Sequence, residues 1–209
     1  LMNLGADSLH FLGWGTAFFD ADNDGWLDLF VANGHVYAGI DKLGIGTTFL
    51  ERNQFFRNQA GKRFLQSAGA GGPGLQVRLS SRGAAFGDYD NDGDIDILVI
   101  NVNQPPTLLR NETGNRNSWI QFRLKGTRSN RNGFGAKIRV EWGEHKLFAE
   151  ARSSSSILSQ NDSRIHFGLG ESVDRVDRVE IAWPSGIRQI LTDLPANRLH
   201  EVTESEEGK

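Results

Sequence analysis

The 209-residue sequence has the composition of an ordinary globular protein, with 38% hydrophobic and 23% charged residues. Its formal net charge is only −3, and no basic patch favours nucleic-acid binding. No apolar run reaches the roughly 18 residues that a membrane-spanning helix needs. The absence of cysteine excludes disulfides, thiol chemistry and cysteine-bound zinc. The 25 glycines, against five prolines, favour many tight turns and therefore β structure.

The aspartates are concentrated in two copies of an internal repeat. Nine of the 15 aspartates lie in two stretches, residues 20–28 and 88–96. In each copy an apolar strand leads into the acidic stretch, a buried strand follows, and a further strand ends in Arg-Asn, at residues 57–58 and 110–111. Such self-similarity indicates one supersecondary unit used twice.

Each acidic stretch follows the pattern Asp-x-Asp-x-Asp-Gly-x-x-Asp, which suits a calcium ion. Calcium takes six to eight oxygen ligands, and a loop with alternate carboxylates supplies them around a glycine that permits the sharp turn. We therefore predict two calcium ions, one in each loop. The predicted ligands are the carboxylates of Asp20, Asp22, Asp24 and Asp28 with the backbone carbonyl of Trp26, and those of Asp88, Asp90, Asp92 and Asp96 with the backbone carbonyl of Asp94.

The alternative interpretation of one such loop is a solvated acidic turn without metal. Without a cation, converging carboxylates repel one another and their pKa values rise. Two copies at matched positions favour the metal site. The loops are not EF-hands, because position twelve is Val31 or Val99 instead of Glu and strands follow directly. The ion is therefore expected to fix a turn between two strands.

The first copy contains an insertion of about 15 residues within residues 34–52, a length that is uncommon for a loop unless it is functional or disordered. Both interpretations, a disordered excursion and a binding loop, stay open. His35 is the one histidine in this segment and the only histidine singled out as a candidate for chemistry, although a plain surface histidine is the favoured interpretation.

After residue 113 the acidic pattern stops and short alternating segments follow. Alternation in Ile138–Trp142 and Val176–Ile181 predicts antiparallel strands that face water on one side. No convincing amphipathic helix is present, so the chain is predicted to be all-β, with domains at 1–113 and 114–206. The predicted strands are Trp119–Lys125, Ala136–Trp142, Lys146–Ala151, Ile165–Gly168, Val176–Trp183, Arg188–Leu191 and Leu199–Val202.

Both halves resemble known families. The acidic loops, with Phe86-Gly87 before the second, resemble the FG-GAP/VCBS repeats of calcium-binding β-propeller blades. The second half resembles the ASPIC/UnbV domain, and the order of the two matches cartilage-acidic-protein-like proteins. The motifs that carry the second resemblance are Gly126-Thr127, Ser129–Ala136, Leu158-Ser159-Gln160, His166–Gly170 and Trp183–Gly186.

The resemblance implies a partial β-propeller of two calcium-loop blades, followed by a small antiparallel β-sandwich-like domain. Because a propeller usually needs four to eight blades, the remaining blades are expected upstream. It also implies a secreted, cell-surface or periplasmic protein, and no agreed activity.

We therefore expect a calcium-stabilised extracellular or cell-surface binding or adhesion module, without catalysis of its own, for an unknown protein or glycan ligand. The alternative is an enzyme or accessory subunit in a biosynthetic pathway, as the UnbV name suggests. A deep pocket that holds His35 or a carboxylate outside the metal loops would favour the enzyme.

Overall fold

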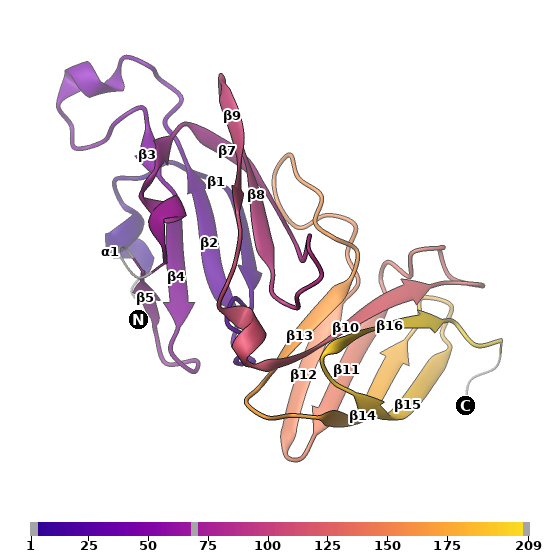
Figure 1. Ribbon diagram of the computed structural model, residues 1–209. Coiled ribbons are helices and arrows are strands. Elements are labelled where there is room, and N and C mark those ends of the chain that lie inside the picture. The colour runs from indigo at the N-terminus through magenta and orange to yellow at the C-terminus, as the bar shows by residue number, and fades with distance from the viewer. Residues whose placement is uncertain (1–3, 68–70, 207–209) are drawn as a thin grey trace.

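The computed structural model describes residues 4–67 and 71–206 and confirms an all-β chain (Figure 1). Five sheets account for its strands, and every pairing but one is antiparallel. Helical segments are short. They are α1 (Leu4–Ser8) and the 3₁₀ turns Ile40–Leu43, Pro73–Gln76 and Gly114–Arg116. The sequence had not predicted α1, because five residues are too few for a helical period to show.

The first blade is a four-stranded antiparallel sheet in the order β1-β2-β4-β5. Its strands are β1 (Gly13–Phe19), β2 (Asp28–Asn33), β4 (Gln54–Asn58) and β5 (Phe64–Gln66). The first acidic loop joins β1 to β2, and the insertion joins β2 to β4. Side chains alternate between a buried and an exposed face along these strands, as a strand with one covered face requires.

The second blade repeats this plan with three strands, in the order β7-β8-β9. They are β7 (Ser81–Gly87), β8 (Asp96–Asn101) and β9 (Gln104–Leu109). The second acidic loop joins β7 to β8. A separate two-stranded pair joins β3 (Glu51–Arg52), which directly precedes β4 of the first blade, to β6 (Arg78–Leu79), which directly precedes β7 of the second.

The two blades pack through aromatic and aliphatic side chains from both sheets. The Phe86 ring of the second blade lies 5.2 Å from the ring of Phe19 and 5.9 Å from that of Phe30, centroid to centroid. Phe30 and Val99 are fully buried in the same cluster. Strands β1 and β7 contact each other, so equivalent strands of the two blades are adjacent, as expected in a propeller.

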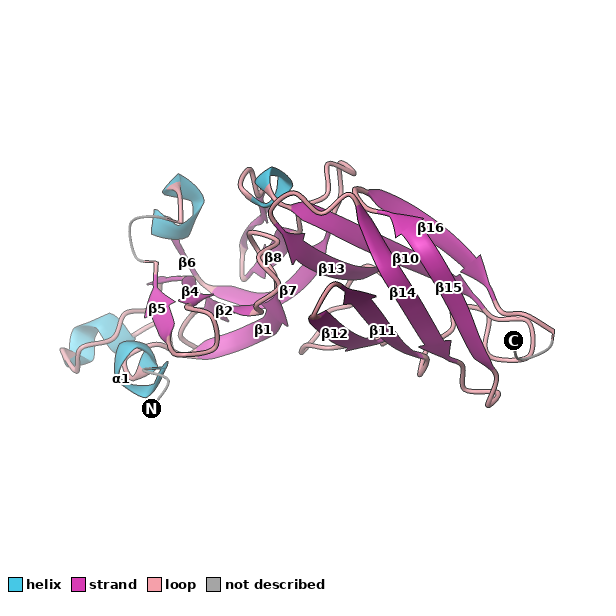
Figure 2. Cartoon of the chain, turned by 90° about the horizontal axis from the view of Figure 1, so that it is seen from below, coloured by secondary structure: helices cyan, strands magenta, loops and turns pink. Residues whose placement is uncertain are grey.

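The C-terminal part is a sandwich of two sheets, seen beside the blades in Figure 2. One sheet has the order β13-β10-β16 and the other β12-β11-β14-β15. The strands are β10 (Ser118–Lys125), β11 (Lys137–Trp142), β12 (His145–Glu150), β13 (Ile165–Gly170), β14 (Arg175–Ala182), β15 (Arg188–Pro195) and β16 (Arg198–Thr203).

The core of the sandwich lies between its sheets, where Phe122 and Phe167 of one meet Ile138 and Val179 of the other. Strand β10 does not extend the second blade but pairs with β13 and β16. The β10–β16 pairing is parallel, so the domain expected to be antiparallel contains one parallel pair.

Candidate metal centre

Each acidic loop is a tight turn closed by its first aspartate. In the first loop Asp20 accepts hydrogen bonds from the backbone N–H of Asp24 at 3.1 Å and of Gly25 at 2.8 Å. In the second loop Asp88 accepts from the equivalent groups of Asp92 and Gly93, at 3.1 and 3.2 Å. The repeated spacing therefore produces the same local fold twice.

Two positions in each turn take left-handed backbone angles. The fourth residue is asparagine, with φ of 55° at Asn23 and 62° at Asn91. The sixth is glycine, with φ of 87° at Gly25 and 98° at Gly93. Asparagine and glycine tolerate this region better than other residues, so the Asn-Asp-Gly sequence favours the turn locally.

The last aspartate of each loop connects the loop to the strand that ends in Arg-Asn. The Asp28 carboxylate accepts from the N–H of Ala21 at 3.1 Å and of Asn58 at 2.7 Å. The Asp96 carboxylate accepts from the N–H of Tyr89 at 3.1 Å, and a further bond comes from Asn111 at 2.8 Å. This explains why the repeat includes the Arg-Asn strand end.

Three carboxylates converge in each loop. Oxygen atoms of Asp20, Asp22 and Asp28 lie within 4.8 Å of one another, and so do those of the matched residues of the second loop, Asp88, Asp90 and Asp96.

The other predicted ligands lie in the same loops but outside these groups. Asp24 and Asp92 each accept from the backbone N–H two residues on, Trp26 at 2.9 Å and Asp94 at 3.2 Å. Asp94 also accepts from the Gly114 N–H at 2.9 Å through its side chain. Ligation by Asp24, Asp92 and the carbonyls of Trp26 and Asp94 stays a prediction.

The electrostatics of the first loop fit a bound cation. Burial, and then the neighbouring carboxylates, raise the pKa of Asp20 to about 8, and burial chiefly raises that of Asp28 to about 7. Asp22 Oδ1 is buried and has no hydrogen-bond partner among the residues that the structure describes. Arg57 pairs with Asp22 but is half exposed. An all-carboxylate donor set whose charge is only partly offset by Arg57 suits a hard ion such as Ca²⁺.

The second loop has the same donor set with more compensation from neighbouring groups. Burial raises the pKa of Asp96. Hydrogen bonding, first with Asp94, lowers the pKa of Asp92. Arg110 lies 3.0 Å from Asp90 and 3.9 Å from Asp92, measured from guanidinium nitrogen to carboxylate oxygen. The pairing of Arg57 and Arg110 with equivalent aspartates shows that the loops and strand ends are connected in both copies.

The first loop also binds the second loop and the sandwich through one buried side chain. Asn23 Nδ2 donates to the carbonyl oxygens of Gly93 at 2.9 Å and Gly114 at 2.8 Å. Its Oδ1 lies 2.6 Å from His166 Nε2 on β13, and its carbonyl accepts from the Gly170 N–H at 2.8 Å. Asn23 has no exposed surface. It therefore links three segments that are far apart in the sequence.

The second loop contacts the sandwich through Gln121 on β10. Gln121 Nε2 lies 3.0 Å from Asp88 Oδ2 and 3.2 Å from His166 Nδ1. Arg164 donates to the Asp88 carbonyl and to Asn91 Oδ1, the latter at 2.7 Å. A continuous path of hydrogen bonds thus runs from Asp88 through Gln121 and His166 to Asn23.

Burial, and then the charge of Arg164, lower the pKa of His166 to about 3, so the imidazole is neutral near pH 7. Because Asn23 already donates through Nδ2, its Oδ1 is the acceptor and the proton of His166 resides on Nε2. Sequence reasoning missed His166, although it lies in the His-Phe-Gly-Leu-Gly motif. The close approach also requires Gly168, where a Cβ would lie 2.1 Å from Asp20 Oδ2.

Comparisons with known proteins match two family models to separate parts of the chain. The model of the FG-GAP-like repeat family matches residues 20–99, and the model of the ASPIC and UnbV family matches residues 126–209. The predicted resemblance to these two families is therefore confirmed: the chain carries an FG-GAP-like repeat region followed by an ASPIC/UnbV region.

Most of this chain is similar to a part of cartilage acidic protein 1. The Homo sapiens protein is 25% identical over 194 residues, covering 88% of this chain, and the Mus musculus protein matches equally. The Xenopus tropicalis protein is 27% identical over 110 residues, covering 50% of this chain. The chain spans 27% of the length of the human and mouse proteins.

Proposed function

We propose that this chain is a calcium-stabilised extracellular binding module without catalysis of its own, in which two calcium ions fix the turns of adjacent propeller blades. The observation that carries the proposal is the convergence of three carboxylates, at the same positions, in both acidic loops. When bound, calcium would neutralise these buried charges and hold the turns. Asp20, Asp22, Asp28 and their counterparts would hold the ions.

The proposal extends to the junction between two domains, residues 1–113 and 114–206. Asn23 and Asp88 belong to the calcium loops and also bond to the sandwich. An ion that orders these loops would order the junction as well. Calcium would thereby hold the sandwich in a fixed orientation on the blades and keep any surface shared by the two parts in one arrangement.

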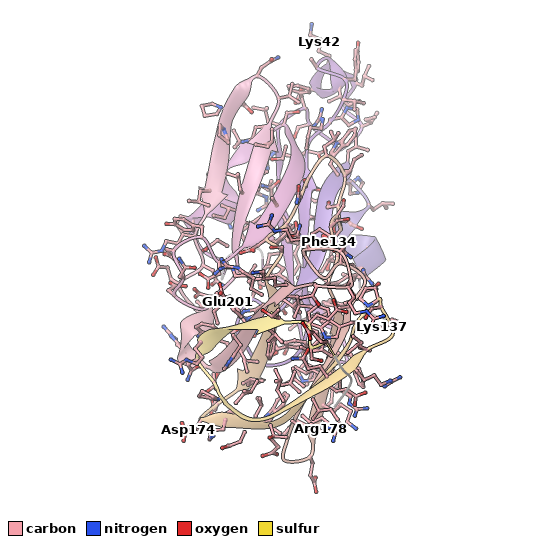
Figure 3. All side chains as sticks on the ribbon, turned by 90° about the vertical axis from the view of Figure 1, so that its right-hand side faces the viewer. Lys42, Phe134, Lys137, Asp174, Arg178 and Glu201 are labelled. Carbon is pink, nitrogen blue, oxygen red and sulfur yellow. The ribbon has the colours of Figure 1, made fainter. Side chains whose placement is uncertain are left out.

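Binding of a protein or glycan ligand is supported by the insertion in the first blade. Its Val36, Tyr37, Leu43 and Ile45 are exposed large apolar side chains. Figure 3 shows Lys42, between them, at one extremity of the molecule, with Asp174 and Arg178 near the other. We take these exposed apolar side chains as the candidate contact surface, because exposed apolar surface can mark an interaction site.

The insertion is held by its own hydrogen bonds. The Phe49 carbonyl accepts from the His35 N–H at 3.1 Å, and Glu51 accepts from Thr47 at 2.8 Å and from the Leu12 N–H at 2.9 Å. These contacts favour the binding-loop interpretation over a disordered excursion.

The resemblance to cartilage acidic protein 1 supports a secreted or surface location as part of this proposal, and further blades would complete the propeller. Among the described residues, no helix combines the length and apolar character needed to cross a membrane.

His35, the histidine that an enzyme hypothesis would use, accepts from the Tyr37 N–H through Nδ1 at 3.0 Å and borders neither of two surface hollows, around residues 52–55 and 137–139. The second hollow is lined by Glu150 and Glu180, which lie outside the acidic loops, but both carboxylates pair with arginines. Hydrogen bonding, first with Arg188, lowers the pKa of Glu180, which does not suit a general acid. We therefore favour the binding module.

Isothermal titration of the metal-free chain with calcium tests the proposal. Wild type should bind two ions, and Asp22→Ala and Asp90→Ala one each. Asp174→Ala, which removes an exposed aspartate of the sandwich, is the matched control and should bind two. Absence of binding by wild type would refute the proposal, and equal stoichiometry in all four proteins would place the ions elsewhere.

A further inference from the structure

The C-terminal strand β16 leads directly to a buried carboxylate. Glu204 follows the strand and is only 2% exposed. Its backbone N–H donates to the Lys125 carbonyl at 2.9 Å, which extends the pairing of β16 with β10 by one residue. The side chain therefore starts from a fixed position at the end of the sheet.

Five donors from two turns converge on this carboxylate. Its Oε2 accepts from three successive backbone N–H groups, those of Thr127 at 2.8 Å, Arg128 at 2.8 Å and Ser129 at 2.7 Å. Its Oε1 accepts from the hydroxyl of Ser129 at 2.9 Å and from that of Ser185, which lies in the turn between β14 and β15. The two oxygens are thus held by separate sets of donors.

The charge of Glu204 is stabilised by neutral groups. Burial alone would raise the pKa of this carboxyl, but the hydrogen bonds from Ser129, Ser185 and Thr127 outweigh burial and lower the pKa to about 2. Successive N–H groups directed at one oxygen form an anion-binding concavity, as in many phosphate sites. A carboxylate that accepts two or three such bonds is strongly favoured in its charged form.

We propose that residues 127–129 and Ser185 form a carboxylate-binding pocket whose resident ligand is the chain's own Glu204, and that the vacated pocket binds a free monocarboxylate. The five bonds all end on the two carboxylate oxygens, so the pocket selects for a planar, charged, two-oxygen group. Thr127 and Arg128 are exposed, which places the pocket at the surface, within reach of a small acid. Attachment of the C-terminal strand to the sandwich therefore includes the binding of a carboxylate by this pocket.

Chemical rescue tests the pocket. Glu204→Ala should unfold at a lower urea concentration than wild type in sodium chloride. Sodium acetate at the same ionic strength should move its midpoint back toward the wild-type value, and the effect should saturate. In ¹⁵N spectra of the variant, the amide signals of Thr127, Arg128 and Ser129 should shift on titration with acetate. If the variant folds only in acetate, that result also supports the pocket.

Two further variants separate the pocket from general salt effects. Glu201→Ala removes an exposed glutamate of the same strand, labelled in Figure 3, and should show no response to acetate beyond that of wild type. Glu204→Gln fills the pocket with a neutral group, so it should be destabilised and not rescued.

An equal increase of the urea midpoint in acetate for wild type, Glu204→Ala, Glu204→Gln and Glu201→Ala would overturn the proposal. Unchanged amide signals at residues 127–129 in a folded Glu204→Ala would also overturn it. If Glu204→Ala folds in neither salt, the stability of Glu204→Gln at pH 7 tests the proposal instead. Lower stability than wild type supports a pocket that selects for a charged group, and stability equal to wild type overturns the proposal.

Discussion

Replacing Asn23 with alanine should weaken the junction between the blades and the sandwich. The variant would leave the carbonyls of Gly93 and Gly114 and the Nε2–H of His166 without their buried partner. At about 1 kcal/mol for each bond, the loss is about 3 kcal/mol, because buried groups left unpaired are costly. Alanine at a φ of 55° adds about 1 kcal/mol. We therefore expect the free energy of unfolding to fall by about 4 kcal/mol.

Asn91→Ala is the matched control, because Asn91 has the same position in the second loop and a φ of 62°. Asn91 is exposed and accepts one bond, from Arg164 at 2.7 Å. Both variants share the backbone cost, so their difference isolates the buried bonds and should be about 2 kcal/mol. Urea denaturation followed by tryptophan fluorescence, with calcium present, measures both. Equal losses for the two variants would refute the role assigned to Asn23.

Three further predictions concern the ions, the buried histidine and the linker. Calcium at a hundredfold excess over Kd should stabilise wild type by about 2.7 kcal/mol per site. Asp22→Ala and Asp90→Ala should each lose the stabilisation from one site, measured as the difference between thermal melts in calcium and in chelator. Identical melts of wild type in calcium and in chelator would contradict stabilisation of the fold by calcium. His166, whose pKa is lowered to about 3, gains a proton on unfolding below pH 6.5. Its contribution to stability is therefore complete above pH 6.5 and is lost by up to about 1.4 kcal/mol per pH unit as the pH falls toward 3. His166→Phe should remove that slope between pH 5 and 6.5, and an unchanged slope would show that His166 is already protonated in the fold. Trypsin should cleave after the exposed Arg116, in the linker between β9 and β10, faster in chelator than in calcium, because Gly114, two residues earlier, is hydrogen-bonded to both acidic loops. Equal cleavage rates would indicate that calcium does not order this linker.

The strands and the turns of the acidic loops could be predicted from the sequence because their causes are local. Alternation predicted strands at Ile138–Trp142 and Val176–Ile181, and β11 spans Lys137–Trp142 and β14 spans Arg175–Ala182. The loop turn depends on residues at most five positions apart, such as Asp20 and Gly25. The junction could not be predicted in the same way. The contact between Asn23 and His166 joins residues 143 positions apart, and no pattern in one sequence records such a pairing.

The two loops show how one motif can acquire two roles. Bonds within each turn are nearly identical in the two copies, so the arrangement of the loop carboxylates follows from the repeated sequence. The bonds to the sandwich differ because a single sandwich contacts two blades that lie side by side. The first loop meets β13 through Asn23, whereas the second meets β10 through Asp88. Asn23 is consequently buried and Asn91 exposed, although both have the same place in the motif. A substitution at equivalent positions should therefore affect ion binding similarly but affect the junction unequally.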